Sequence, residues 1–460
     1  MSGGTTLIPP DGGWGWIIMF AYIINNLLIV PIQQNFGLLF KEAFIHMGMS
    51  GTNVTSVIST NMSASLLVGT CAGPLIKRFG IRNVAIVGSM LFTMGIISLA
   101  LATNYTSLLV CYGLLTGLGE GIIRLTSTLS LNLYFAKKRR KVAGVALALR
   151  SLGSVVFPHI IVLFLAVYGT SSATLLIGGL CFHTVCASLL LRPVEWYMKK
   201  APCADLPGTD VGAPLLSLND KDQHSQGILQ PHGILARFAR YYDLALLKNS
   251  VYINITVGMM FSVFSDISFE TLFALILSDL NFDDHKIAVF VSTSYISNII
   301  IRFAIPFVGD YFRRSSRFMY ALSCCVVIIG RFFIIYLANT KIVVTSIIWG
   351  VAHGMRTVYW SVIIADNVPA HQLPSAESMF IASNGVLCLI CGPMLGREFW
   401  CNCSILCKNV TLGWIKDATG SFVNCVYVLN GFTLITCGLW FTEWFFRKIE
   451  RKPAVTETVT

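Results

Sequence analysis

Charged residues are scarce in this chain of 460 residues. Asp, Glu, Lys and Arg make up only 12% of the sequence, whereas apolar residues make up 55%. A typical soluble domain has about twice that share of charged residues. The composition therefore excludes a soluble globular protein of this size and indicates an integral membrane protein.

The sequence also lacks the motifs of several other functions. It has no GxxxxGK[ST] loop for phosphate binding, so we expect neither ATP-driven transport nor an enzyme, and no cofactor. The one compact group of cysteines, Cys401, Cys403 and Cys407, has no histidine beside it, so we expect a loop there and no metal site. The net charge of +11 is concentrated at the ends of apolar runs, which indicates membrane topology and not nucleic-acid binding.

Apolar runs of about 20 residues, the length that crosses a bilayer, are the main feature that is present. The first begins at Trp14 with no basic segment before it, so we expect a retained helix and not a cleaved signal peptide. The sequence predicts an all-α membrane protein with twelve transmembrane helices in two six-helix halves. The expected spans are 14–36, 53–76, 84–103, 107–131, 142–167, 171–191, 250–277, 287–309, 318–338, 342–365, 376–395 and 421–442.

Two similar basic turns, 73–82 and 306–314, follow apolar runs at positions about half the chain apart. Such a duplicated half resembles the major facilitator architecture, in which the substrate site lies at the membrane midplane between two six-helix repeats. The expected units are a tail at 1–13, a bundle at 14–192, a linker at 193–248, a bundle at 249–445 and a tail at 446–460.

The basic residues predict the orientation in the membrane. Of the 33 Lys and Arg residues, 22 fall on the side of the two termini and six on the opposite side. Cytosolic segments carry the excess of positive charge, so we expect both termini in the cytosol. The sequons at Asn104 and Asn409 then lie on outside loops and are candidates for glycosylation.

Arg302 is the strongest candidate for a functional residue, because it lies near the middle of an expected span. A guanidinium group at that depth costs about 3 kcal/mol or more, so such residues usually face a polar cavity or a partner. Two interpretations stay open, namely substrate binding and a structural ion pair within the bundle.

Other charges lie within the expected spans. Glu120 and Arg124 are four residues apart on one helix face and can form an ion pair, either within the bundle or at the substrate site. Asp266 and Glu270 share one face of the seventh span, so we expect a carboxylate pair facing Arg302. The remaining charges within spans are Arg150, Arg331 and Arg356, and for Arg331 we favour a structural role.

The two basic turns suggest a cytosolic gate. Lys77 and Arg78 lie in the first turn, and Asp310 and Arg313 lie in the second. Opposite charges at equivalent ends of the two halves can hold that side of a carrier closed.

Several segments resemble the monocarboxylate transporter family. They are the start of the first span at 10–16 (PDGGWGW), Tyr134-Phe135 before a basic run, Leu191-Arg192-Pro193, the pair Asn298 and Arg302, and 413–422. The resemblance implies the major facilitator fold, a small organic anion as substrate, symport with a proton, and a location in the plasma membrane. It also implies a single-span accessory glycoprotein as a partner.

The chain departs from the family pattern in two substrate-site positions. Gln34 stands where proton-coupled members have a lysine, and Asn298 stands where some have an aspartate. We therefore expect weak proton coupling, unless Glu120, Asp266 or Glu270 replaces the missing proton carrier. The segment 397–412 resembles an insertion in an outside turn. The expected substrate site comprises Arg302, Asn298, Gln34, Asp266 and Glu270.

The predicted function is transport of small organic solutes, chiefly monocarboxylates, by secondary-active or facilitated alternating access. One alternative is a proton-independent facilitator of amino-acid-like or zwitterionic solutes. Another is a receptor or scaffold that has kept the fold and lost transport. The sequence leaves open the substrate, the direction of transport and the oligomeric state.

Overall fold

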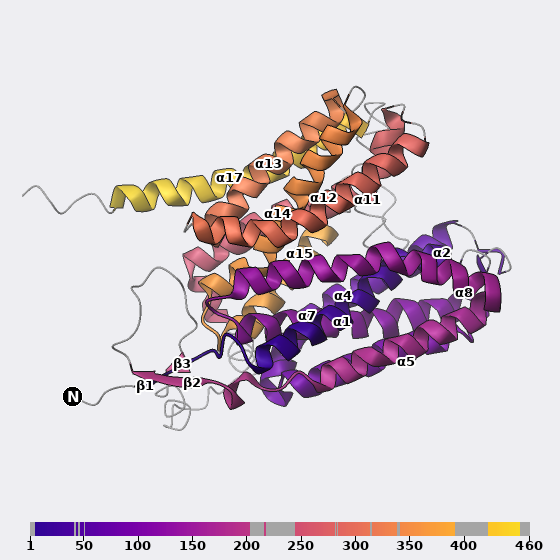
Figure 1. Cartoon of the computed structure of the whole chain (residues 1–460), viewed down its shortest axis with the longest axis horizontal. Coiled ribbons are helices and arrows are strands. Elements are labelled where there is room, and N and C mark those ends of the chain that lie inside the picture. Colours follow the sequence, from indigo (N-terminus) through magenta and orange to yellow (C-terminus); the bar gives the residue numbers. More distant parts are fainter. Residues whose placement is uncertain are drawn as a thin grey trace, which may run out of the picture.

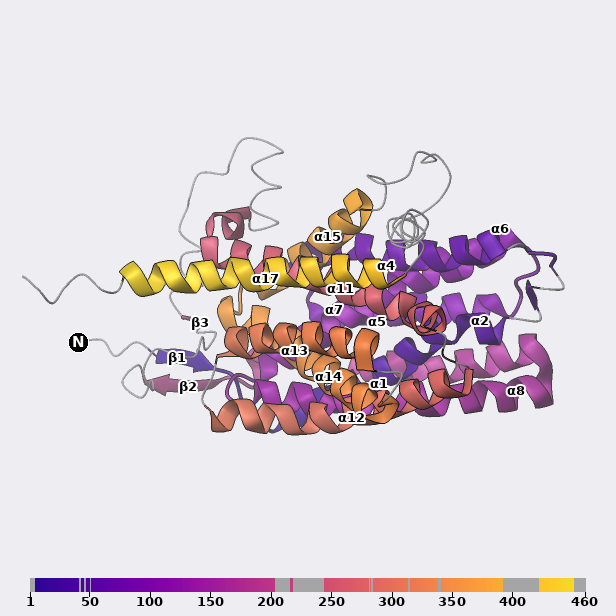
Figure 2. The same ribbon diagram turned by 90° about the horizontal axis from the view of Figure 1, so that it is seen from above.

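The computed structural model describes residues 5–40, 43–44, 47–49, 51–202, 216–217, 244–280, 282, 284–312, 315–337, 341–391 and 422–450. These ranges form two bundles of long helices and a small sheet at one end (Figure 1). The long helices run along a common direction, as the view from above shows (Figure 2). The all-α prediction is thus confirmed for the part that crosses the membrane, and the short strands lie outside it.

In the described residues, the first bundle has helices at all six expected spans. Its fifth and sixth spans form one element, α8, but Gly169 breaks that element with a φ of 72°, which favours glycine. The break falls between the expected spans 142–167 and 171–191. The elements are α1 (Trp14–Gln34), α2 (Phe36–Leu39), α4 (Gly51–Phe79), α5 (Ile81–Leu99), α6 (Tyr105–Leu108), a π-helical segment (Leu109–Thr116), α7 (Gly117–Tyr134) and α8 (Arg139–Leu189).

The second bundle has helices at the other six expected spans. Eight helices of the described chain are long and apolar enough to cross a bilayer, and α8 is one of them. The protein is therefore a multi-pass membrane protein. The elements of this bundle are α11 (Ser250–Asp279), α12 (Asp284–Tyr311), α13 (Ser316–Leu337), α14 (Ile342–Asn367), α15 (Leu373–Cys391) and α17 (Phe422–Glu450).

Glycines let α7 pack closely against both of its neighbours. A Cβ atom at Gly119 would lie 2.4 Å from the backbone N of Phe92 on α5, and one at Gly121 would lie 2.5 Å from the carbonyl O of Ser65 on α4. Small residues drive close helix packing in membranes, where apolar burial between helices contributes little. This packing fixes the position of Glu120, which lies between the two glycines.

The PDGGWGW segment joins the start of the first bundle to its later helices. The Oδ1 atom of Asp11 accepts hydrogen bonds from the backbone N–H of Ala136 (2.8 Å) and of Lys138 (3.2 Å), just before α8. The indole of Trp14 donates to the carbonyl O of Leu190 (3.2 Å), and the guanidinium of Arg192 lies 4.2 Å from the Trp14 ring centre. The segment therefore connects the start of α1 to both ends of the two-span element α8.

A three-stranded antiparallel sheet lies beside this junction, with strand order β2-β1-β3. Strand β1 (Thr5–Ile8) pairs with β2 (Lys199–Pro202), so that Thr5 is opposite Pro202 and Ile8 is opposite Lys199. It also pairs with β3 (Leu216–Ser217). The expected tail and linker thus meet in one sheet, and their status as separate units stays a prediction.

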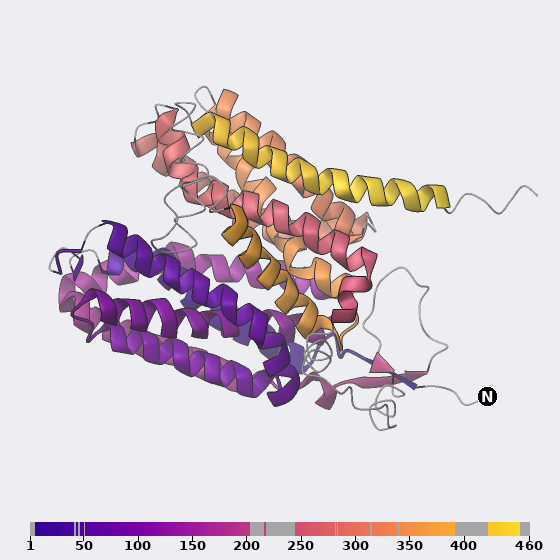
Figure 3. The same cartoon turned by 180° about the vertical axis from the view of Figure 1, so that it is seen from behind.

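The two bundles meet at one end and diverge at the other. The end at which α1 begins and α17 ends is called the terminal end, and the opposite end is called the far end. Figures 1 and 3 both show the bundles separating toward the far end. At the terminal end, Asn132 of α7 donates to the carbonyl O of Ser361 on α14 (3.1 Å). There, too, a Cβ atom at Gly73 of α4 would lie 3.0 Å from the carbonyl O of Pro374. The structure is therefore closed at the terminal end.

Candidate substrate cavity

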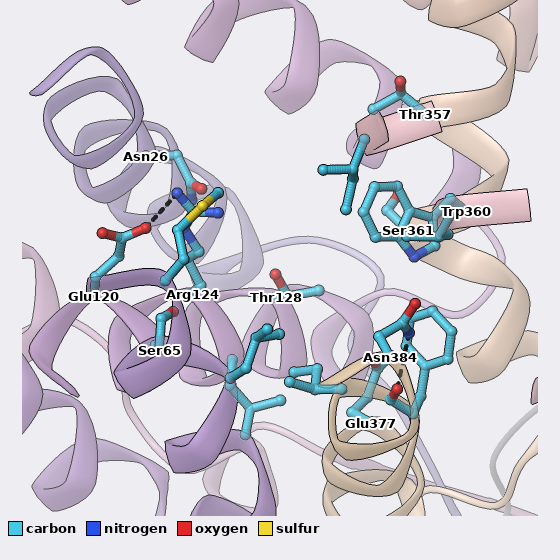
Figure 4. A pocket seen from close by; sticks show the side chains of 18 of the residues that line it. Asn26, Ser65, Glu120, Arg124, Thr128, Thr357, Trp360, Ser361, Glu377 and Asn384 are labelled. Carbon is cyan, nitrogen blue, oxygen red and sulfur yellow. Dashed lines mark hydrogen bonds and ion pairs between the residues drawn. The ribbon is translucent and has the colours of Figure 1, made fainter. Parts of the chain in front are cut away.

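A cavity of about 310 Å³ lies between the two halves. The first half lines it with α1, α4, α7 and α8, and the second half lines it with α11, α14 and α15. Four charged side chains line it, namely Glu120, Arg124, Arg150 and Glu377. Its size suits a small solute. Figure 4 shows Glu120 and Arg124 on one wall, with Trp360 and Glu377 on the opposite wall.

Glu120 and Arg124 form the ion pair that their spacing predicts. The Arg124 Nη2 atom lies 2.5 Å from Glu120 Oε1, and Glu120 is only 2% exposed. Arg124 also donates to the side-chain amide of Gln33 on α1. Gln33 lines the cavity. Gln34, which the sequence predicts as a substrate-site residue, is exposed and is not among the lining residues.

Arg302 lies directly behind the cavity wall on α12. Its guanidinium donates to the carbonyl O of Leu147 (3.2 Å), to Ser151 Oγ and to Thr357 Oγ1 (3.5 Å), all uncharged acceptors. Leu147 and Thr357 themselves line the cavity. Arg302 is 6% exposed, and its Nε atom has no hydrogen-bond partner among the described residues. The charge of Arg302 is therefore buried without a direct ion pair in this part of the chain.

A chain of hydrogen bonds runs beside Arg302. Asn298 donates from Nδ2 to His353 Nδ1 (2.9 Å), and His353 Nε2 lies 2.8 Å from Glu270 Oε1. Glu270, whose side chain is 50% exposed, also interacts electrostatically with Arg302 and Arg150. The structure thus brings three of the predicted site residues together. His353, on α14, was missed because its partners come from distant segments.

Asp266 is not brought to Arg302. It lies in the second bundle, where Arg331 Nη2 is 3.0 Å from Asp266 Oδ1 and Arg356 Nη2 contacts Asp266 Oδ2. Four residues of an α-helix correspond to a rotation of about 40° beyond one full turn. That offset is enough for Glu270 to face the space between the bundles while Asp266 faces the interior of its own bundle.

At the terminal end, Asp310 connects the two halves. Its carboxylate lies 3.2 Å from Lys141 Nζ and 3.8 Å from Arg140 Nη1, both on α8. Lys77 and Arg78 are exposed at the end of α4, and Arg313 lies outside the described residues. The gate at these four positions stays a prediction.

A second ion pair at this end was missed from the sequence. Arg139 of α8, which is 2% exposed, lies 2.8 Å from Asp366 of α14. Asp366 also accepts a hydrogen bond from Ser316. The basic run before the fifth span is the feature that could have indicated this contact.

The candidate glycosylation site at Asn104 lies away from the cavity. Asn104 is exposed and caps α6 at the far end, where its Oδ1 accepts a hydrogen bond from the N–H of Ser107 (2.8 Å). Asn409 and the segment 397–412 lie outside the described residues. In the ranges that are described, no group of three or more His, Cys, Asp or Glu side chains is placed to hold a metal ion.

The twelve helices and the cavity between two halves define a carrier of the major facilitator type. The family model of the Major Facilitator Superfamily matches residues 15–392, and the chain belongs to this superfamily. Members of this superfamily transport solutes and are not enzymes, which agrees with the sequence-based prediction.

Within this superfamily, the chain is similar to monocarboxylate transporters. The chain is 24% identical to monocarboxylate transporter 13 of Rattus norvegicus over 94% of this chain and 90% of that protein. It is also 24% identical to monocarboxylate transporter 2 of Meriones unguiculatus, over 94% of this chain and 84% of that protein. The predicted resemblance to monocarboxylate transporters is thus confirmed.

Solved structures show the same fold. The transporter FucP in the outward conformation gives a TM-score of 0.64 at 12% identity, covering 92% of this chain and 98% of FucP. The human organic anion transporter MFSD10 (TETRAN) gives 0.60 at 14% identity, covering 94% of this chain and 99% of that one.

Proposed function

We propose that the protein carries small monocarboxylates across the plasma membrane by alternating access, with the carboxylate bound by Arg302 and Arg150. The observation that supports this function best is the buried guanidinium of Arg302, whose direct contacts among the described residues are all with uncharged groups. A buried cation of this kind is stabilised by an anionic partner, and a planar guanidinium suits a carboxylate. Arg150 lines the cavity and also contacts Asn26 Oδ1 (3.3 Å).

The contacts of Arg302 also suggest how binding would move the halves. Arg302 belongs to the second half, whereas Leu147 and Ser151 belong to α8 of the first half. A carboxylate that pairs with Arg302 competes for the same N–H groups and so weakens this contact between the halves. Binding would then favour opening of the terminal end, as alternating access requires.

The orientation and partners follow the sequence-based expectations. We place both termini in the cytosol, so that the cavity is reached from the outside in the present state. Lys77, Arg78, Asp310 and Arg313 are the proposed gate on the cytosolic side, and the contacts of Asp310 with Lys141 and Arg140 support its part in it. An accessory single-span glycoprotein is proposed from the resemblance alone.

The test is counterflow of labelled propionate in proteoliposomes that contain the purified full chain. The wild type should accumulate label against excess internal propionate, whereas Arg302→Ala should abolish the accumulation because the binding cation is removed. Arg302→Lys should restore it only in part, since a point charge lacks the paired N–H groups of guanidinium.

Lys341→Ala is the control that also removes a cation, because Lys341 is exposed at the start of α14 and is not among the cavity-lining residues. Its counterflow should equal that of the wild type. Full-rate counterflow by Arg302→Ala would refute the binding assignment. No counterflow of any carboxylate by the wild type would favour a receptor or scaffold.

A further inference from the structure

Glu377 is a cavity-lining carboxylate that the proposed function does not use. It lies on α15, together with Asn384, on the wall opposite Glu120 and Arg124 (Figure 4). In the described part of the chain, no hydrogen bond or ion pair joins the Glu377 side chain to another group. Its carboxylate is therefore available to a ligand.

Arg139 acts on Glu377 electrostatically, but each of its three guanidinium nitrogens already donates to another group. They donate to the carbonyl O atoms of Asn132 and Phe135 and to Asp366. Arg139 therefore cannot turn to neutralise Glu377 without breaking the terminal-end contact with α14. A cationic group within the cavity would supply the missing partner.

The four charged side chains that line the cavity sum to zero. Glu120 and Arg124 neutralise each other. Glu377 is then the carboxylate that matches Arg150. A simple anion would add a charge that no group in this set balances, which is costly at membrane depth. A substrate that carries one carboxylate and one ammonium group adds no net charge.

We propose that Glu377 forms a second subsite, which binds the ammonium group of an amino-acid-like monocarboxylate whose carboxylate is held at Arg150 and Arg302. This inference rests on the proposed function and specifies its substrate class. Trp360 and Phe380 also line the cavity, and an aromatic face attracts an ammonium group. Figure 4 shows Trp360 on the same wall as Glu377.

The test uses pairs of ligands that differ only in the ammonium group, namely alanine with propionate and 4-aminobutyrate with butyrate. Each is measured as an inhibitor of labelled propionate uptake in proteoliposomes. In the wild type, at least one amino acid should inhibit at a lower concentration than its analogue. Glu377→Gln should weaken inhibition by that amino acid about ten- to hundredfold, the usual effect of losing a charged hydrogen bond. The same variant should bind propionate more tightly, because a like charge has been removed.

Glu195→Gln is the matched control, since Glu195 is exposed near the start of the linker, away from the cavity. It should leave both inhibition constants at the wild-type values. If Glu377→Gln does not reach the membrane, Glu377→Asp is used in its place, because it keeps the carboxylate on a side chain that is one methylene shorter. It should shift the preference from alanine toward 4-aminobutyrate.

The inference is overturned if the amino acids inhibit no better than their analogues in the wild type, or if Glu377→Gln weakens both ligands equally. It is also overturned if Glu377→Gln mainly removes a pH response of propionate uptake, because Glu377 would then carry a proton. Failure of the proposed function is seen separately, as propionate uptake that does not depend on Arg302.

Discussion

Three buried arginines of the second bundle differ in what surrounds them. Arg331 and Arg356 share the carboxylate of Asp266, and Arg331 also lies 4.7 Å from the Phe269 ring centre. Arg302 has no such carboxylate in direct contact in the described chain. The sequence identified all three positions, but their neighbours come from different helices. The sequence-based prediction therefore favoured a structural role for Arg331 but assigned no role to Arg356.

At the same scale, Glu120 should matter for stability. Breaking a buried ion pair costs about 3–5 kcal/mol when one charge is left unpaired. The loss should be smaller here, because the Arg124 side chain is 39% exposed. Glu120→Gln should lower the thermal unfolding temperature of the purified protein, as followed by tryptophan fluorescence.

The double variant Glu120→Gln, Arg124→Gln should recover part of that loss, because it leaves no unpaired cation. Unfolding of Glu120→Gln at the wild-type temperature would show that the pair does not stabilise the fold.

The helices are the elements that the sequence predicts best. Each expected span overlaps a helix of the structure, because long apolar runs in a bilayer must satisfy their backbone hydrogen bonds within the helix. Rotation about the helix axis is less well predicted. The nearby positions Asp266 and Glu270 face different surroundings. Gln34 was predicted as a substrate-site residue, but it is its neighbour Gln33 that lines the cavity. Glu377 and His353 were missed because helix contacts, and not local spacing, bring them to the site.

The contact between α8 and α12 should control closure of the terminal end. Asp310→Asn removes the carboxylate that faces Lys141 and Arg140. Asp310 is partly exposed, so we expect a shift of about 1 kcal/mol, a several-fold change in the populations of the closed and open states. A cysteine at position 378, which packs against Gly73 of α4, reports on this opening.

In inside-out vesicles, Ser378→Cys should react faster with an impermeant maleimide when combined with Asp310→Asn. The same measurement with Lys77→Ala tests whether α4 contributes to the gate. If Ser378→Cys is labelled at the same rate alone, with Asp310→Asn and with Lys77→Ala, the two basic turns act only as topology signals and not as a gate.

On the scale of the whole molecule, the balance of charges bears on proton coupling. Gln34 and Asn298 do not titrate, and Glu120 is paired with Arg124. If the substrate adds no net charge, transport needs no proton to balance it. An imposed pH gradient should therefore change the accumulation of substrate little.

The measurement is uptake with and without the gradient in the wild type, Glu120→Gln, Asp266→Asn and Glu270→Gln. Strong accumulation driven by the gradient in the wild type, and lost in one of these variants, would identify that carboxylate as a proton carrier.

The sheet at the terminal end has a consequence for the order of events during synthesis. Strand β1 lies at the very start of the described chain, yet both of its partners are made about two hundred residues later. Closing so long a loop is unfavourable until the intervening helices have brought its ends together. Strand β1 therefore remains unpaired on the ribosome while all six spans of the first bundle enter the membrane. Formation of the sheet then marks the completion of that bundle.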